Sequence, residues 1–237
     1  VVADLAADIG ALARSVDLLV LAGPVDGILS DLDALGASGA SVIATDVGST
    51  KGEICARARA VLPAGVLFAG GHPIAGSERG GFRASRADLF EGAPWALVPP
   101  GKAGSAAPVP DAILALLELL GARPVIVDAT AHDEILARTS HLPQTLAVAL
   151  ANVIADLLDA HPLARDLVGS GLTDLLRIAE SPQRMWSPVL AGNAEQIRRA
   201  VAELHAHLDV AQDPSRSAAA FSRAARLRRQ LPRREGS

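Results

Sequence analysis

The chain has 237 residues; half are apolar, only 3% are aromatic, and none is tyrosine. That length allows one large or two modest domains, each with its own core. The formal net charge of −4 argues against a nucleic-acid-binding protein, which is normally basic. The one cysteine, Cys55, excludes an intramolecular disulfide and a thiolate zinc site. It is typical of a reducing compartment, so we expect a cytoplasmic protein.

The sequence also gives no signal for a membrane. It contains no uninterrupted apolar run of the length that a membrane-spanning helix needs. No basic segment followed by an apolar one opens the chain, so we expect no secretory leader and no membrane partner.

Apolar runs and helical patterns alternate through the first part of the chain. Short apolar runs bounded by turn residues predict three buried strands, at residues 18–22, 41–45 and 66–68. Apolar stripes at helical spacing predict three helices, at residues 4–14, 25–35 and 53–61. This alternation is typical of a parallel sheet with helices on its faces.

The pattern changes after Asp128. Before it, strands are predicted at 96–98 and 124–127, with a helix at 112–120 between them. After it there are only helical stripes, at residues 132–160, 173–179, 182–190 and 194–208. We therefore expect an α/β domain at residues 1–128 and an all-helical domain at 129–237.

Two details of the helical part carry further expectations. Ser181 and Pro182 are a good start signal for the helix at 182–190, with the serine as N-cap. The arginine-rich tail from Arg216 is interpreted as a solvated or frayed helix rather than a binding patch.

The helical stretch predicted at 132–160 carries an unusually wide apolar face. Its members are Leu142, Leu146, Ala149, Leu150, Val153, Ile154 and Leu157. A face of this width is buried either within a helical bundle or in a subunit interface. Together with the helix at 194–208, it offers more apolar surface than a small helical unit can hide, so we expect a homodimer.

The segment Gly70-Gly71-His72-Pro73 follows the third predicted strand. Pro73 biases His72 toward extended angles, so the imidazole is predicted on a loop beyond the strand. Ligands bind at the carboxyl ends of strands in open α/β sheets. Histidine titrates near neutrality and can act there as a general base. The alternative is a loop histidine that only caps the strand.

The turn at residues 46–52 joins a strand to a helix. Its free N–H groups could meet an anion or the polar edge of a cofactor, although it lacks the glycine spacing of a phosphate-binding loop. A structural helix cap is the alternative. Ser49 is short and polar, and can hydrogen-bond a nearby imidazole and orient it.

His141 and Gln144 flank a proline inside a helical pattern. Pro143 removes one helical hydrogen bond and frees the carbonyl of Thr139. His141 and Gln144 are three residues apart and share a face, which is typical of the wall of a site. A buried histidine with a backbone partner is the equal alternative.

Arg177 stands among apolar neighbours. A part-buried guanidinium needs a partner, and a carboxylate suits it best. That carboxylate is either Asp174, three residues earlier, or one from a substrate.

Taken in order, these motifs resemble the prephenate and arogenate dehydrogenase family of tyrosine biosynthesis. The resemblance runs from residue 18 to about 208 and rests on the turn at 46–52, Gly-Gly-His-Pro-x-Ala-Gly-Ser-Glu at 70–78, Asp-Leu-Phe-Glu-Gly-Ala at 88–93, Ser-His-Leu-Pro at 140–143 and Arg-Ile-Ala at 177–179. It implies a Rossmann-type nucleotide-binding domain, incomplete at its N-terminus, followed by an all-α dimerisation domain. The implied reaction is oxidative decarboxylation of prephenate to 4-hydroxyphenylpyruvate, or of arogenate to tyrosine, with NAD or NADP.

The resemblance also implies roles for particular residues. His72 matches the catalytic histidine that binds the C4 hydroxyl, Ser49 the serine that orients it, and Arg177 the arginine that anchors a substrate carboxylate. The other residues implied in the substrate site are Ser77, His141 and Gln144. The residues implied beside the cofactor are Gly23, Pro24, Val25, Gly48 and Ser49. No metal is implied.

Two departures from the family pattern keep alternatives open. Gln144 stands where prephenate-preferring members often have a second histidine, so the choice of substrate stays open. The chain also has no Gly-x-Gly-x-x-Gly, a motif that the family carries ahead of the position aligned with Val1. The alternatives are another two-domain NAD(P)-dependent dehydrogenase, and a non-catalytic dimeric ligand-binding or interaction protein that lost its nucleotide site.

Overall fold

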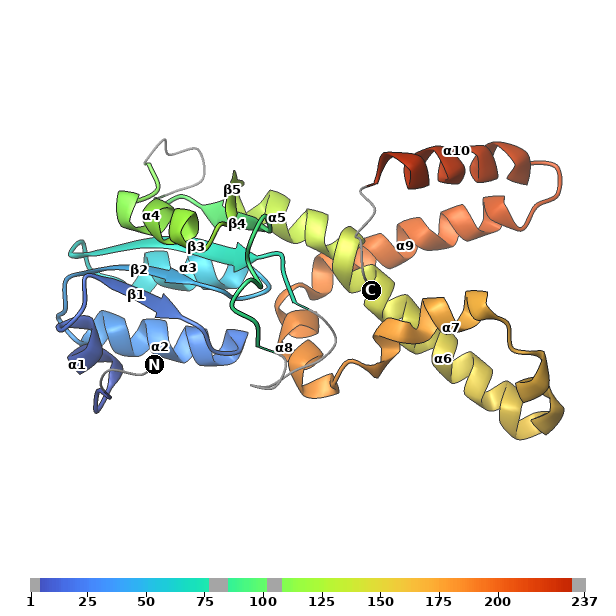
Figure 1. Cartoon of the computed structure of the whole chain (residues 1–237), viewed down its shortest axis with the longest axis horizontal. Coiled ribbons are helices and arrows are strands. Elements are labelled where there is room, and N and C mark those ends of the chain that lie inside the picture. Colours follow the sequence, from blue (N-terminus) through green and yellow to red (C-terminus); the bar gives the residue numbers. More distant parts are fainter. Residues whose placement is uncertain (1–4, 77–84, 102–107, 232–237) are drawn as a thin grey trace.

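The structure is a computed structural model that describes residues 5–76, 85–101 and 108–231. A five-stranded sheet occupies one end of the molecule and helices form the other end (Figure 1). The strands follow one another across the sheet in chain order: β1 (Leu18–Leu21), β2 (Val42–Asp46), β3 (Val66–Pro73), β4 (Pro94–Val98) and β5 (Arg123–Ile126). Within the described residues, no strand follows β5.

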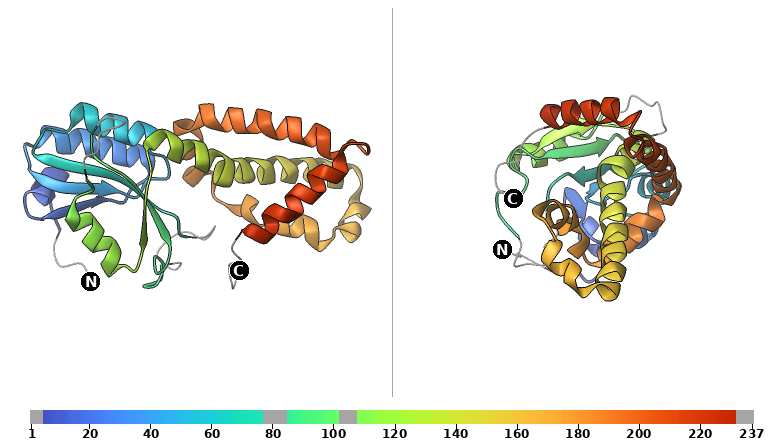
Figure 2. Two further views of the ribbon diagram at one scale, coloured as in Figure 1. Left: turned by 90° about the horizontal axis from the view of Figure 1, so that it is seen from above. Right: turned by 90° about the vertical axis from the view of Figure 1, so that its right-hand side faces the viewer.

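Helices cover the sheet on both faces (Figure 2, left view). They are α1 (Ile9–Ala13), α2 (Val25–Ala37), α3 (Gly52–Val61) and α4 (Asp111–Leu119). On one face, α2 and α3 pack the side chains of Ile28, Leu32 and Ile54 against the sheet. On the other face, α4 contributes Ile113 and Leu117 to a second core around Trp95. The expected α/β alternation is therefore present, although α1 is shorter than the predicted helix at 4–14.

β3 changes partner half-way along its length. From Val66 to Ala69 it pairs in parallel with β2. From Gly70 to Pro73 it pairs antiparallel with β4, where His72 lies opposite Ala96. One expectation is thus wrong, because His72 lies within a strand rather than on a loop. The three strands predicted as a parallel sheet do pair in parallel, and β4 joins them antiparallel. The cause is a continuation of the extended backbone through both glycines, which a second neighbour stabilises by hydrogen bonds.

The second half of the chain is helical in its described residues. Its elements are α5 (Ala129–Leu136), a π-helical turn η2 (Ala137–His141), α6 (Leu142–Ala160), the 3₁₀ turn η3 (Pro162–Leu167), α7 (Ser170–Leu176), the 3₁₀ turn η4 (Arg177–Glu180), α8 (Gln183–Gly192), α9 (Ala194–Ala211) and α10 (Ser217–Gln230). The helix of α5, η2 and α6 runs from the edge of the sheet to the far end of the molecule (Figure 1).

Two local expectations in this half have different outcomes. Ser181 does not cap α8: its hydroxyl donates instead to the carbonyl of Ile178 at 2.9 Å, and Pro182 is the N-cap residue. The arginine-rich tail does form a helix, α10, and it has no buried residue. It lies beside α9 (Figure 1).

The wide apolar face of α6 is largely exposed in the single chain. Val153 is 63% exposed, and Leu146 and Leu157 are also open to solvent. Only Gln144 and Ala147 of this helix are buried. The alternative of burial inside a bundle is therefore wrong for most of the face within one chain.

The continuous helix Ala129–Ala160 is long and apolar enough to cross a membrane by length and composition alone. The sequence offered no such segment, because charged and polar residues interrupt its apolar runs. A long apolar helix of a water-soluble assembly passes the same test, so this feature is weak evidence for a membrane.

Candidate active site

The Asp46 carboxylate organises the carboxyl end of β2. Its Oδ2 accepts a hydrogen bond from the N–H of Gly48 at 2.8 Å and pairs with the Lys51 ammonium. Its Oδ1 accepts from the N–H of Gly71 on β3 at 2.9 Å. Asp46 and Lys51 are both fully buried. A buried pair of this kind holds its geometry because losing either partner would leave an uncompensated charge.

The two glycines of β3 let the strand pass close to this pair. A side chain at Gly71 would lie 2.4 Å from the backbone oxygen of Asp46, which is closer than any real contact. At Gly70 it would lie 2.7 Å from the sulfur of Cys55. Only glycine fits at these positions, so β3 passes directly beside the buried pair just before it reaches His72.

The Asp133 carboxylate of α5 caps the N-terminus of α3 from another part of the chain. Its Oδ1 accepts from the N–H of Lys51 at 2.8 Å, and its Oδ2 accepts from the N–H of Gly52 at 2.7 Å. α3 has no side-chain cap of its own at its N-cap residue, Lys51. A carboxylate is favoured there by the free N–H groups and by the helix dipole.

A row of hydrogen bonds links His72 to this carboxylate. His72 Nδ1 lies 2.9 Å from His132 Nε2, and His132 Nδ1 lies 2.7 Å from Asp133 Oδ1. The rings of His72 and His132 meet edge to face, with centroids 5.1 Å apart. Both histidines are thereby held in fixed orientations.

Burial lowers the pKa of His72 well below its ordinary value of 6.5. The neighbouring groups His132, Lys51 and His141 lower this pKa further. His72 is therefore neutral at neutral pH, which is the form that can accept a proton.

His141 is held beside this cluster by Asn193 and Trp186. Its Nδ1 lies 3.1 Å from Asn193 Nδ2, and its ring packs edge to face on Trp186 at 6.0 Å. Asn193 also donates to the backbone oxygen of Asp133 at 2.8 Å. His141 thus has a side-chain partner, whereas the alternative was a buried histidine with a backbone partner. It lines the same cluster as His72.

Gln144 and Ser49 are neighbours in the sequence of the residues that form this cluster. Gln144 is buried on the first turn of α6, three residues beyond His141. Ser49 is half-buried on the turn between β2 and α3. Among the described residues, the partner of His72 is His132 rather than Ser49.

The expected cofactor residues lie at the carboxyl ends of two parallel strands. Gly23, Pro24 and Val25 follow β1, and Gly48 and Ser49 follow β2. Pro24 is the N-cap residue of α2 and provides no side-chain cap, so the first N–H groups of this helix are not capped by it. A side chain at Gly48 would lie 2.6 Å from Ile54.

The remaining expected substrate residues have different positions. Arg177 opens η4 and is exposed in the single chain, not part-buried. Its partner, either Asp174 or a substrate carboxylate, therefore stays a prediction. Its surroundings are open because α7 and η4 contain no buried residue. Ser77 lies outside the described residues.

His132, Asp133 and Asn193 were missed by the sequence analysis. The signal for the first two was a polar His-Asp pair following Asp128, which is the N-cap of α5 and accepts from Ala131 at 2.9 Å. Their partners Lys51 and His72 are far away in the sequence, so only the fold brings the four together.

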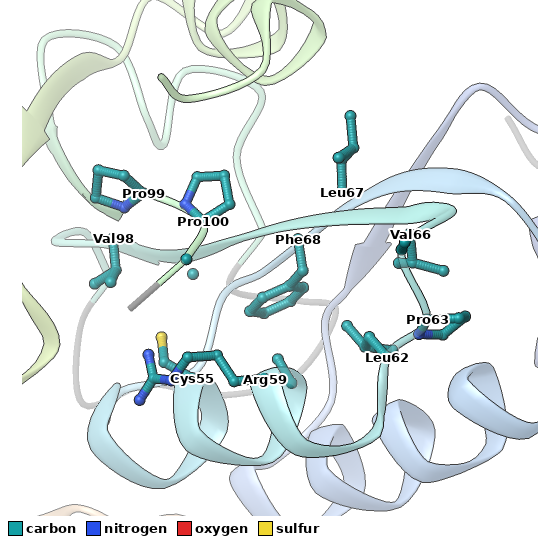
Figure 3. A pocket seen from close by; sticks show the side chains of 14 residues that line it. Cys55, Arg59, Leu62, Pro63, Val66, Leu67, Phe68, Val98, Pro99 and Pro100 are labelled. Atoms are coloured by element: carbon teal, nitrogen blue, oxygen red, sulfur yellow. The ribbon is translucent and has the colours of Figure 1, made fainter. Parts of the chain in front are cut away.

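A separate cavity of about 340 Å³ lies between α3 and the strands β3 and β4 (Figure 3). Its lining is mainly apolar, from residues such as Leu62, Phe68 and Val98, with the side chains of Cys55 and Arg59 on the helix side. Burial raises the pKa of the Cys55 thiol to about 12, so it is protonated and is not a nucleophile. The chemistry is therefore expected at the His72 cluster.

Comparison with known families accounts for both halves of the chain. Residues 1–126 match the nucleotide-binding domain of prephenate dehydrogenase, and residues 128–220 match its dimerization domain. The chain belongs to the prephenate dehydrogenase family. The predicted resemblance is thereby confirmed, as is the predicted fold class of a Rossmann-like nucleotide-binding domain followed by a helical domain.

Curated relatives carry the same family name. The chain is 34% identical to prephenate dehydrogenase of Lactococcus lactis over 200 residues, which is 83% of this chain and 54% of that protein. It is 34% identical to prephenate dehydrogenase of Bacillus subtilis over 181 residues, 76% of this chain and 48% of that protein. The chain thus spans about half the length of these relatives.

Solved structures share the fold. Prephenate dehydrogenase from Aquifex aeolicus in complex with hydroxyphenyl propionate and NAD+ is 25% identical, with a TM-score of 0.76 over 95% of this chain and 80% of that one. Synechocystis arogenate dehydrogenase is 26% identical, with a TM-score of 0.75 over 94% of this chain and 81% of that one. Within the family, relatives named for either substrate therefore have this architecture.

The buried state of His141 predicts a pH-dependent stability. Burial lowers the pKa of His141 from 6.5 to about 4; the nearby Asp133 opposes this shift and His132 adds to it. Between pH 7 and pH 5 the unfolded chain binds a proton at this residue that the folded chain does not. The free energy of unfolding should therefore fall as the pH falls, by about 2 kcal/mol from His141 alone.

Urea unfolding at pH 7, 6 and 5 checks this prediction. His141→Asn should lose part of the decrease, whereas the exposed control His161→Asn should keep all of it. An unchanged decrease in His141→Asn would show that this histidine is not buried in its neutral form.

Proposed function

We propose that the protein catalyses the oxidative decarboxylation of prephenate or arogenate, with hydride transfer to NAD or NADP. The observation that carries this proposal is His72, a half-buried neutral imidazole held by His132 in a member of the prephenate dehydrogenase family. A base of this kind is what the reaction needs, because the C4 hydroxyl of the substrate must lose its proton as hydride leaves. We further propose that residues 1–128 form the nucleotide-binding domain and 129–237 the helical domain, and that the protein is cytoplasmic.

The residues at the carboxyl ends of β1 and β2 suit the nicotinamide end of such a cofactor. The start of α2 leaves N–H groups uncapped after Pro24, and Gly48 keeps the second turn narrow. We assign Gly23, Pro24, Val25, Gly48 and Ser49 to this contact. When bound there, the cofactor would supply the hydride acceptor.

The chain's own residues provide orientation, a base and charge. His72 Nδ1 is engaged by His132, so Nε2 is the nitrogen left to receive the proton of the C4 hydroxyl. Loss of CO2 then makes the ring aromatic, and the oxygen takes the proton back from His72. Aromatisation supplies a large driving force, so positioning is the main task of the protein.

The substrate's carboxylates require partners at the other side of the site. We assign Arg177 to one of them, since a guanidinium binds a carboxylate with two parallel hydrogen bonds. The indole N–H of Trp186, beside His141, is a buried donor without a partner in the described part of the chain, and it suits a polar group of a ligand. Ser77, His141 and Gln144 complete the proposed substrate site.

Replacing His72 by asparagine tests the proposed base. The amide keeps a polar group beside His132 but cannot accept the hydroxyl proton as imidazole does, so turnover should fall by about 10²–10⁴-fold. Steady-state rates with prephenate and arogenate on the intact protein measure this. Folding and cofactor affinity should be retained, and the exposed control His205→Asn should keep full activity. Near-normal turnover in His72→Asn would remove this residue from the mechanism.

Gln144 is proposed to set the substrate choice. Prephenate carries a pyruvyl side chain, whereas arogenate carries a cationic amine in its place. A protonated histidine at this position would repel that amine, while the neutral amide of glutamine does not. We therefore expect the protein to accept arogenate as well as prephenate.

The ratio of kcat/KM for the two substrates checks this expectation. Gln144→His should shift the ratio toward prephenate, whereas the exposed control Gln212→His should not. If histidine leaves the ratio unchanged, Gln144 is not the discriminating residue.

We propose that the exposed face of α6 forms the interface of a homodimer. The matched dimerization domain, and the exposure of Leu146, Val153 and Leu157 in the single chain, support this. An obligate interface of this kind buries more than roughly 2,000 Å². Val153→Glu should therefore give a monomer in light scattering at micromolar concentration, because a charge would be buried at the interface. Leu119→Glu, an exposed site on α4, should leave the dimer intact. A monomeric native protein would contradict the proposal.

A further inference from the structure

The hydrogen bonds around Asp133 determine where the protons of two histidines lie. An ionised carboxylate only accepts hydrogen bonds, so the short contact between Asp133 Oδ1 and His132 Nδ1, 2.7 Å, requires the proton to be on His132 Nδ1. The same oxygen also accepts from the N–H of Lys51, at 2.8 Å, so both its lone pairs have donors. In neutral His132 the other nitrogen, Nε2, is then an acceptor.

The same reasoning gives the position of the proton on His72. His132 Nε2 lies 2.9 Å from His72 Nδ1, so an acceptor at His132 requires the proton of neutral His72 to be on Nδ1. Its Nε2 then carries the free lone pair. We propose that His132 and Asp133 are positioning residues that hold His72 in this tautomer, so that Nε2 is its basic atom. Neither residue needs to touch the substrate for this role.

The row of hydrogen bonds from His72 through His132 to Asp133, here called the relay, would matter most while His72 is charged. The hydroxyl proton moves to Nε2 as hydride leaves and returns to the same oxygen as the aromatic ring forms, so no proton has to leave the site. During that interval, His72 is a cation, and its burial and the nearby Lys51 disfavour its charge. The hydrogen bond to His132, backed by the Asp133 carboxylate, stabilises the cation at that moment. This catalytic part of the inference rests on the proposed function, whereas the tautomer does not.

Asp133 also makes the tautomer depend on the contact between the two halves of the chain. His72 is on β3 of the sheet, while His132 and Asp133 are on the first helix of the helical half. The carboxylate is fixed by the N–H groups of Lys51 and Gly52 at the start of α3, and the backbone oxygen of Asp133 by Asn193 at the junction of α8 and α9. His72 is therefore held in the proposed tautomer only when β3, α3, α5 and the junction of α8 and α9 pack together.

Nitrogen NMR of the protein labelled with ¹⁵N-histidine reads the tautomer directly. The chain has six histidines, and the signals of His72 are identified as those missing from His72→Asn. We expect His72 to carry its proton on Nδ1 at pH 7 in the native protein. His132→Leu should give a mixture of both tautomers, whereas His132→Gln should retain the Nδ1–H form, because the glutamine oxygen can accept from it. A native His72 protonated on Nε2 overturns the proposal without any variant of His132.

Turnover of the intact protein tests the catalytic part. His132→Leu should lower kcat by roughly 10²-fold with little change in KM, and His132→Gln should recover about tenfold of that loss. The exposed control His205→Leu should match the native enzyme. A kcat of His132→Leu within twofold of native contradicts the relay. If the native protein shows the Nδ1–H tautomer but turns over neither substrate, the proposed function fails and the positioning of His72 stands.

Discussion

The Asp133 carboxylate is the group on which the arrangement of the site depends. It meets three donors: the N–H groups of Lys51 and Gly52, and the imidazole of His132. Gly52 has to be glycine, since a side chain there would lie 2.8 Å from the carboxylate. This one side chain thus accepts hydrogen bonds from the free N–H groups at the start of α3, joins the two halves of the chain and orients a histidine. Because a carboxylate buried without donors would be costly, these elements must assemble together.

The second constraint is the buried charge pair of Asp46 and Lys51. It ties the ends of β2 and β3 together and places a fixed positive charge beside His72. The strand passes this pair only because Gly70 and Gly71 lack side chains. The cost of burying two charges is met here by hydrogen bonds to Gly48 and Gly71, which satisfy the remaining oxygen lone pairs.

Much of the fold could be predicted from local pattern, and little of the site. The strands at Leu18–Leu21 and Val42–Asp46 and the helix at Val25–Ala37 follow from apolar spacing and turn residues, which act over a few positions. His72 was placed on a loop, because nothing local shows that β4 pairs with the strand after Ala69. The partnership of His72 with His132 spans 60 positions, and that of Lys51 with Asp133 spans 82. Such contacts depend on tertiary packing, which spacing along a chain does not encode.

The π-helical turn at Ala137–His141 has a consequence for the phase of the long helix. Its bond from the N–H of Leu142 to the oxygen of Ala137 spans five residues instead of four. In a regular α-helix, His141 would follow His132 by about 2.5 turns and would point to the opposite side. The wider turn lags behind that rotation, and both imidazoles become part of one cluster, as the effect of His132 on the pKa of His141 indicates. If the same residues formed a regular α-helix here, either His132 or His141 would turn away from its partner, so the one extra residue that this turn holds decides which side chains share a face.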